Sequence, residues 1–417
     1  MATTRSYGDL LNDYLPNEML FEEMVKRDWF LQNVKKRQDW KGGALKVPFK
    51  GAGASSVKFG GLTAENDIAE SQYPVGSVSD YVEVWGSIAL NQRDLLDHSG
   101  KIPESTFLKL LPDELERFME YMKQVCSVAI ATGPHFATFT ADGEADGEIT
   151  VDKIDRFAVG QKVVLDDGNS DAGTYYVTAI NINTSKITVS ATRGGAAADV
   201  SAFTTAQSAK VYHDGLSASG GSFTSIRSAL LSAANGGSST LHGISKLAWP
   251  HLQACNIDGS GMSAANCLKL IFNGYNEVRK KAKGNANTVV MSYKHLGSVM
   301  KLIDLQKGGF SVSKQPSASQ YGWTEIEVTS VKGVLKLVGI QEMDDDVIFY
   351  LDMNSFNFNS NGGIRKNKSP DGLEYYTVRA TTGYKYITDL SLFGEMTYEN
   401  VGHNGIMYGI TAYSDAA

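Results

Sequence analysis

The sequence predicts an α+β fold in which a small β module interrupts a larger framework of helices and strands. Three observations predict it: a long amphipathic helix near 104–132, short alternating runs over 135–215, and a regular exchange of helix and strand from 263 onward. The sequence therefore does not predict domains that simply follow one another along the chain.

Composition limits the classes of function. The chain has 417 residues, 42% of them apolar, and a formal charge of 39 − 46 = −7. Without a concentrated basic face, sequence-specific recognition of nucleic acid is disfavoured. No apolar run is long enough to span a membrane, and the first residues lack a secretory core. We expect a soluble, non-secreted chain with reduced thiols.

Residues 1–43 are predicted to form a helical arm. Asn17 is a candidate cap for a run that begins with Leu20 and repeats at helical spacing. Apolar side chains, Trp29 and Phe30 among them, also spread around the helix. A terminal helix with this much apolar surface is expected to pack on something, and another subunit is one candidate.

Residues 44–86 are predicted to form an extended, hairpin-like excursion. Val47 and Phe49 alternate with polar residues, and Val57–Phe59 resumes the pattern after a glycine-rich tip. This predicts a strand, a flexible tip and a second strand. The excursion has too few apolar residues for its own core, so we expect it to lie along something else.

Residues 87–134 carry the strongest helix signal. Pro112 is placed to open the helix, with 104–111 extending it beyond a bend, and Gly133-Pro134 ends it. The following 135–216 are predicted to be an inserted small β-barrel or sandwich. Its five expected strands are Glu148–Val151, Lys162–Leu165, Tyr175–Ile180, Lys186–Ser190 and Ala209–Tyr212.

Residues 217–361 are predicted to form an α/β region. The expected elements are a helix capped by Ser263, a strand at Thr288–Ser292, a helix at Tyr293–Leu305, and strands at 324–331, 334–340 and 347–351. The last strand is continuously apolar and is therefore expected at the centre of a sheet. Residues 362–417 return with strands at Glu374–Arg379, Tyr384–Thr388 and Leu392–Thr397.

Candidate chemical sites fail on spacing. His242, His251, Cys255 and Cys267 include two thiols twelve residues apart, far from the spacing of paired zinc ligands, so packing in the core is the favoured interpretation. A calcium-loop pattern beginning at Asp167 lacks the glycine and glutamate it needs. Asp344-Asp-Asp346 is interpreted as a solvated turn. No phosphate loop or nucleophile motif occurs, and we expect no enzyme activity, cofactor or metal.

The order of parts resembles the major capsid protein of tailed bacteriophages, the Hong Kong-phage-type fold. The segments that carry the resemblance are WKGGALKVPFKGAGASSVKFGG for an extended loop, PDELERFMEYMKQVCSVAIATG for a spine helix, TVVMSYKHLGSVMKLIDL for an apical α/β domain, and GYKYITDLSLFGEMTYENVGHNGIMYGI for the closing peripheral segment. In these terms 87–134 and 362–417 form a peripheral domain and 217–361 an apical domain.

The resemblance implies a structural protein that assembles into pentamers and hexamers of an icosahedral head. Its partners would be further copies of itself, with scaffold, portal and decoration proteins as candidates, and double-stranded DNA as cargo held without sequence-specific binding. It would be made in the host cytoplasm and located in the virion, with no membrane contact. Candidate inter-subunit residues are Leu20, Trp29, Phe30, Val47, Phe49, Lys50, Val57, Lys58, Phe59, Arg365, Lys366 and Lys368.

Two other hypotheses remain open at this point. An encapsulin-like nanocompartment shell shares the fold and would enclose a protein cargo instead of a genome. A β-rich adhesin of a virion or cell surface is a different class, suggested by the 135–215 module and by the abundance of Gly, Ser and Thr.

Overall fold

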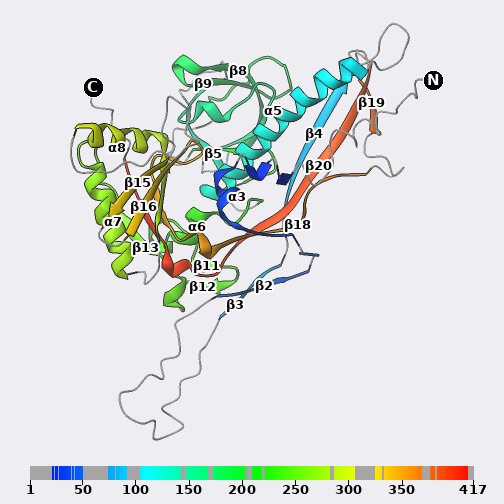
Figure 1. Ribbon diagram of the computed structural model, residues 1–417. Helices are drawn as coiled ribbons and strands as arrows, with labels where there is room; N and C mark the ends of the chain where they lie inside the picture. The colour runs from blue at the N-terminus through cyan, green and yellow to red at the C-terminus, as the bar shows by residue number, and fades with distance from the viewer. Residues whose placement is uncertain are drawn as a thin grey trace, which may run out of the picture. The chain divides into compact units, whose positions relative to one another are not determined.

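The computed structural model describes residues 21–22, 24–26, 28–38, 40–41, 43–49, 74–79, 81–91, 104–141, 147–167, 172–201, 203, 209–217, 221–281, 286–305, 325–330, 333–368, 376–380 and 383–411. The chain divides into two compact units, Met1–Lys123 with Ile226–Ala417, and Gln124–Ser225. Helices and strands are mixed in the first unit, as the α+β prediction requires (Figure 1).

A six-stranded mixed sheet forms one core of the first unit (Figure 1). Its strands, in spatial order, are β13 (Cys255–Asp258), β21 (Gly405–Tyr408), β17 (Ile348–Leu351), β14 (Thr288–Ser292), β16 (Gly333–Ile340) and β15 (Glu325–Ser330). Every residue of β17 and β14 is buried. A strand covered on both faces needs apolar residues at every position, so the predicted central place of 347–351 is confirmed.

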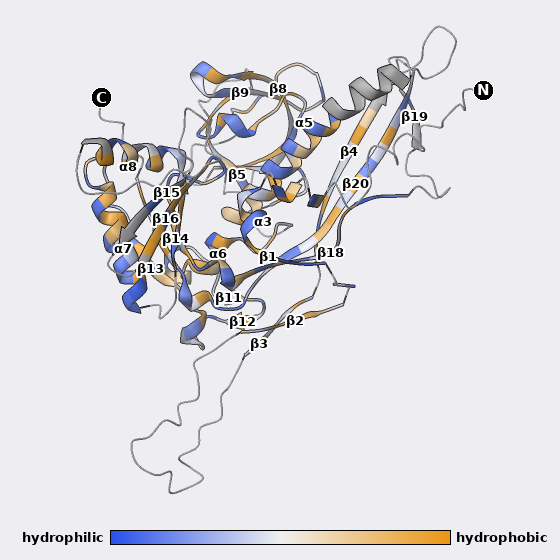
Figure 2. Cartoon of the chain, viewed as in Figure 1, coloured by the Kyte–Doolittle hydropathy of each residue, from blue (hydrophilic) through white to orange (hydrophobic). Residues whose placement is uncertain are grey.

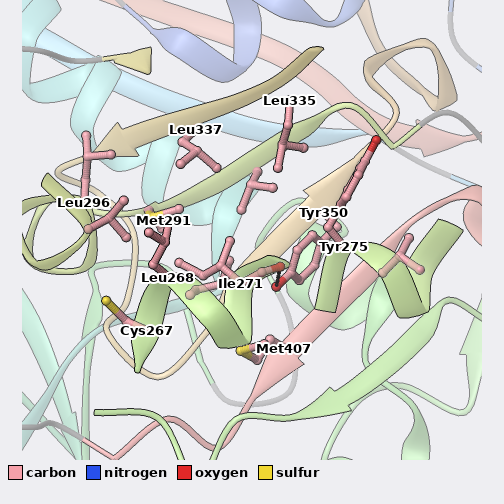
Figure 3. Packing of buried hydrophobic residues seen from close by; sticks show 14 of the residues in the cluster. Cys267, Leu268, Ile271, Tyr275, Met291, Leu296, Leu335, Leu337, Tyr350 and Met407 are labelled. Atoms are coloured by element: carbon pink, nitrogen blue, oxygen red, sulfur yellow. Dashed lines mark hydrogen bonds between the residues drawn. The ribbon is translucent and has the colours of Figure 1, made fainter. Parts of the chain in front are cut away.

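Helices α7 (Cys267–Lys281) and α8 (Tyr293–Leu305) bury one stripe each against this sheet. Figure 3 shows Ile271 and Tyr275 of α7 beside Tyr350 of β17, whose hydroxyl donates to the Ile271 carbonyl oxygen at 3.2 Å. The predicted bounds of α8 are confirmed. Helix α7 begins four residues after the predicted cap, because the Asn266 side chain accepts the Ser263 N–H at 2.7 Å and closes a turn first.

A second sheet is built around the long strand β20 (Gly383–Tyr398). One edge of β20 pairs with β4 (Val82–Asn91), and the other with β18 (Phe356–Lys366) and β19 (Tyr376–Ala380); β1 (Lys35–Arg37) then runs parallel to β18. The sequence predicted two strands, Tyr384–Thr388 and Leu392–Thr397, in this part of the chain. The structure has the single strand β20 instead, because β4 pairs with it in one continuous register.

Strand β18 was not predicted, and it crosses the expected boundary at 361/362. Asparagine is disfavoured in strands, which hid the alternation. Here the asparagine side chains are buried and paired across the sheet: Asn357 donates to Glu399 at 2.9 Å and Asn359 to Thr397 at 2.6 Å. These bonds of the amide nitrogens offset part of the cost of burying the side chains, while Asn357 Oδ1 has no hydrogen-bond partner among the described residues.

The long helix α5 spans Glu104–Ala131 as one element. Pro112 lies inside it, not at its first position as predicted, so the helix continues past a position that has no N–H to donate to residue 108. Within the first unit α5 runs along β4 and β20 (Figure 1). A Cβ on Gly86 of β4 would collide with the ring of Phe118, so glycine permits the close approach of strand and helix. Gly133, with φ +115°, follows the helix end, where a stop was expected.

Beside the sheet, the N-terminal segment folds onto its own chain. Helix α3 (Trp29–Asn33) begins after Asp28, whose side chain accepts the Leu31 N–H at 2.8 Å. Phe21 stacks on Phe358 of β18 with ring centroids 6.4 Å apart. The predicted cap Asn17 lies outside the described residues. The described part of the arm therefore buries its apolar face inside the chain.

A short ribbon stands where the extended excursion was expected. Strand β2 (Leu45–Pro48) pairs antiparallel with β3 (Val75–Val78). The predicted second strand at 57–59 lies outside the described residues, so the partner that the structure shows for β2 is β3, which the alternation of 45–49 alone does not select. The intervening residues 50–73 lie outside the described part. Residues 82–86, which were predicted to belong to the excursion, instead begin strand β4 of the β20 sheet.

The unit Gln124–Ser225 contains a closed barrel. Its strands are β5 (His135–Ala141), β6 (Glu148–Val151), β7 (Lys162–Asp166), β8 (Ala172–Asn181), β9 (Lys186–Ser190) and β10 (Lys210–His213). The five predicted strands are confirmed, and β5 was missed. Inward-facing residues of all six strands form one apolar core, at whose margin buried Arg156 donates to the Phe136 carbonyl oxygen at 2.7 Å.

Short elements complete the first unit: α6 (Ile226–Leu230) and the hairpin of β11 (Thr240–Leu241) with β12 (Ile244–Ser245). Figure 2 shows that hydrophobic colour gathers on the strands of the six-stranded sheet, whereas hydrophilic and hydrophobic residues alternate along β4 and β20. Among the described residues, no helix combines the length and the hydropathy needed to cross a membrane.

Candidate inter-subunit surfaces

The predicted contact residues of the ribbon are covered by their own chain. Val47 is buried, and Phe49 is fully buried against His242 of the β11–β12 hairpin. Neither offers exposed apolar area to a neighbouring molecule. The other ribbon candidates, Lys50, Val57, Lys58 and Phe59, lie outside the described residues, as does Leu20 of the arm.

The remaining candidates divide by exposure. Phe30 is fully buried, and Trp29 packs edge-on against it with centroids 5.3 Å apart, leaving part of the indole exposed. Arg365 and Lys368 are exposed at the end of β18, whereas Lys366 is buried. Arg365 donates to Asn361 at 2.9 Å. Two of the three predicted basic side chains thus present their charge to solvent.

A surface that the sequence analysis missed lies on the β20 sheet, opposite α5. Because residues that pair across antiparallel strands share a face, Trp85 and Ala89 of β4, Ile387 and Phe393 of β20, and Val378 of β19 all point away from the helix. We call these five residues the outer sheet face; the polar residues Glu83, Ser87, Lys385, Asp389 and Ser391 lie between them on the same side of the sheet. Trp85 is 57% exposed and Val378 is 41% exposed. The alternation of 82–91 would have revealed this face once the strand's partner was known.

Aromatic contacts hold one end of the outer sheet face. The Phe393 and Tyr81 rings meet edge-on at 5.2 Å, and Tyr81 meets Trp40 at the same distance and a similar angle. Nearby, Ser87 donates to Asp389 at 2.5 Å. The backbone under Trp85 is therefore well fixed while its indole stays exposed, which is the arrangement of a rigid apolar anchor.

Strand β4 also has an unused edge. One side pairs with β20 along ten residues, and no described strand pairs with the other. An edge of this length is a ready partner for an added strand. Edge and outer sheet face meet at Trp85, so they can act as one surface.

The residues considered for chemistry pack as structural groups. Cys255 and Cys267 are buried in the core around α7, and burial raises the pKa of both thiols. Ring stacking encloses His242, and His251 lies against Trp249. In the described part of the chain, no three His, Cys, Asp or Glu side chains are grouped to hold a metal ion.

The acidic turn 344–346 was predicted to be a solvated turn, but in the structure it is bound by residues of two helices. Arg227 of α6 binds both oxygens of Asp346, at 2.9 and 2.6 Å, and contacts Asp344 at 3.3 Å. His295 of α8 meets the Asp345 carbonyl oxygen at 2.7 Å. The turn therefore ties α6 and α8 to the end of β17, which accounts for its charge.

Comparisons with known proteins were made by sequence and by structure. No family model matches the chain, and no curated protein matches it. Among solved structures, the capsid asymmetric unit of cyanophage A-1(L) is similar, with a TM-score of 0.47 and 14% identity over 99% of this chain and 98% of that one. The capsid of the native GTA particle gives 0.44 and 11%, covering 91% and 89%.

A shell of another kind is also similar. The holo-SrpI encapsulin complex from Synechococcus elongatus PCC 7942 gives a TM-score of 0.40 and 6% identity, covering 93% of this chain and 90% of that one. All three TM-scores lie below 0.5.

Proposed function

We propose that this protein is the major capsid protein of a tailed bacteriophage, a structural subunit that assembles into pentamers and hexamers around packaged DNA. The observation that carries the proposal is the outer sheet face: a rigid sheet presents exposed Trp85 beside a ten-residue edge without a described partner strand. A monomer rarely keeps such a surface bare, and repeated head-to-tail contacts close into rings when the rotation divides a full turn.

The order of elements supports the same proposal. In these terms α5 is the spine helix of a peripheral domain whose sheet joins β4 to the returning strands β18, β19 and β20. The six-stranded sheet with α7 and α8 is the apical domain, and the barrel is the insertion. The ribbon of β2 and β3 is the described base of the predicted extended loop, whose contact with a neighbouring subunit is part of this proposal. Net charge of −7 suits a container whose DNA is cargo.

Electron microscopy of the purified protein under assembly conditions, with a scaffold protein where one is needed, tests the proposal. The matched variant replaces residues 50–73 by a short Gly-Ser turn. We expect rings or shells from the natural chain and a folded but unassembled protein from the variant. A natural chain that stays monomeric at every concentration contradicts the proposal. Particles that contain a protein cargo and no DNA would favour the encapsulin-like alternative.

A further inference from the structure

The two-residue turn between β11 and β12, His242-Gly243, touches the base of the ribbon. Both residues have positive φ, 48° and 82°. Such hairpin turns favour Asn and Gly, because a bulky side chain strains the left-handed backbone. His242 is therefore an unfavourable choice for the turn itself, and its side chain needs another explanation.

The imidazole of His242 is stacked between two rings from different elements. Phe49, just after β2, lies on one side with centroids 6.2 Å apart and planes inclined by 20°. Tyr398, the last residue of β20, lies 5.9 Å away at 27°. Nε2 is buried without a hydrogen-bond partner in the described part of the chain. Burial leaves this nitrogen without a hydrogen bond, but it places the ring in contact with Phe49 of the ribbon and Tyr398 of the sheet.

The second ribbon strand touches the same turn through its backbone. The Ser77 N–H of β3 donates to the His242 carbonyl oxygen at 2.9 Å. A Cβ on neighbouring Gly76 would lie 2.8 Å from the Phe49 ring and 3.0 Å from the His242 carbonyl oxygen. The turn therefore contacts both strands of the ribbon, and the fit leaves no room for a side chain at position 76.

We propose that the His242-Gly243 turn is a socket that fixes the base of the ribbon and presets the direction in which it meets a second copy of this chain. The preset direction rests on the proposed capsid function, whereas the fixing of the ribbon base does not. Holding a contact segment in one direction before association reduces the entropy lost on binding, so the socket would favour assembly.

Hydrogen exchange on the full chain tests the socket, with the amides of Phe49 and Ser77 as reporters and those of β17 as the reference. His242→Asn suits the left-handed turn but removes the ring sandwich, and Gly76→Ala wedges the contact open. We expect the reporter amides to exchange about tenfold faster in both variants, with β17 unchanged. His242→Phe, which keeps a ring between Phe49 and Tyr398, should exchange at close to the natural rate.

Two controls separate the socket from general destabilisation. Gly261→Ala adds a methyl group where no atom lies within 4 Å, and His251→Asn removes a second, half-buried imidazole that meets Trp249 edge-on and does not contact the ribbon rings. Neither should alter the reporter amides. Unchanged reporters in both His242→Asn and Gly76→Ala overturn the socket, as does a His242→Phe variant loosened as much as His242→Asn. If His242→Asn does not fold, Gly76→Ala decides.

Assembly kinetics of the same variants test the preset direction. Slower shell formation by Gly76→Ala than by Gly261→Ala supports it, and equal rates with a loosened ribbon overturn it. Failure of the natural chain to assemble contradicts the capsid function and with it the preset direction, but the exchange result still decides the socket.

Discussion

Arg227 is the residue on which the acidic turn depends. Its guanidinium binds Asp346 through two nitrogens and reaches Asp344, whose side chain is only 13% exposed. Replacing one member of such a partly buried pair leaves the other charge with poor compensation. Arg227→Lys keeps the charge but loses the bidentate geometry.

We expect Arg227→Lys to lower the free energy of unfolding by about 1–2 kcal/mol and Arg227→Ala by about 2–4 kcal/mol. Urea denaturation followed by fluorescence measures both. The control is Lys281→Ala, which breaks the exposed pair with Glu277 and should leave the free energy of unfolding almost unchanged, because solvent screens such a pair. Equal losses from Arg227→Ala and Lys281→Ala would show that the turn does not depend on its arginine.

His242 gives the protein a predictable response to pH. Loss of hydration lowers the pKa of this imidazole to about 4 in the fold, from about 6.5 in the unfolded chain. The unfolded chain therefore binds the proton first as pH falls. The stability that the neutral ring contributes is complete above about pH 6.5, declines between 6.5 and 4, and is lost below that.

Between pH 7 and pH 4 this group should reduce the free energy of unfolding by on the order of 2 kcal/mol. Carboxylates also titrate in this range, so the informative quantity is the difference between the natural chain and His242→Phe, which has no proton to bind. We expect the natural chain to lose more stability on acidification. Parallel curves for the two proteins would rule out His242 as a source of the pH dependence.

Two glycines in neighbouring helices should respond in opposite ways to the same substitution. At Gly274 of α7, a Cβ would collide with the hydroxyl of buried Tyr350 and lie 3.1 Å from Met407, so the helix rests directly on β17 and β21. At Gly297 of α8, no atom lies within 4 Å of that position. Figure 3 shows Tyr350 and Met407 in this core.

Gly274→Ala should destabilise the protein by about 1–3 kcal/mol through overpacking, despite the better helix propensity of alanine. Gly297→Ala should stabilise it by about 0.5–1 kcal/mol through propensity alone. Thermal unfolding compares the two. Adding Tyr350→Phe to Gly274→Ala should recover part of the loss, because it removes the colliding oxygen; a stabilising Gly274→Ala would contradict the close packing.

Periodicity and turn chemistry were enough to place most elements. The bounds of α8, the central place of β17 and five barrel strands are local matters of alternation, caps and glycines, and these predictions are confirmed. Partner choice was not predictable: the sequence does not say that β2 pairs with β3 or that β4 pairs with β20, because these contacts are settled by tertiary packing.

The candidate surface was hidden for the same reason. Trp85 lies in an alternating run of the sequence, but its exposure depends on which face α5 covers. The partners of Asn357 and Asn359 lie about forty residues away, so neither the strand β18 nor its buried amides could be inferred locally. By contrast, the packing role expected for Cys255 and Cys267 needed only their spacing, and it is confirmed.

At the scale of the molecule, the barrel unit should fold without the rest of the chain. Its apolar core draws on every strand of the barrel and includes Val128 from the last turns of α5. Closure removes free strand edges, so the isolated unit should also stay monomeric. We expect residues 124–225 to give dispersed amide NMR signals and one cooperative thermal transition; a collapsed spectrum would show that the core needs the other unit.

The outer sheet face yields the assembly prediction that most directly addresses the whole particle. Since Trp85 is already largely exposed, Trp85→Ser should change the melting temperature of the unassembled protein by less than about 3 °C. A central tryptophan in an interface commonly contributes about 2 kcal/mol or more, so the concentration at which shells appear should rise at least about tenfold.

Leu247→Ser is the matched control, because Leu247 is 86% exposed but lies after β12, outside the β20 sheet. This substitution also removes a largely exposed apolar side chain, yet it should leave the concentration at which shells appear unchanged. Light scattering across a concentration series, with electron microscopy of the end points, measures both variants. If Trp85→Ser assembles like the natural chain, the outer sheet face is not the contact and the shell must close through other surfaces; if Leu247→Ser fails as well, general hydrophobicity and not a specific interface governs association.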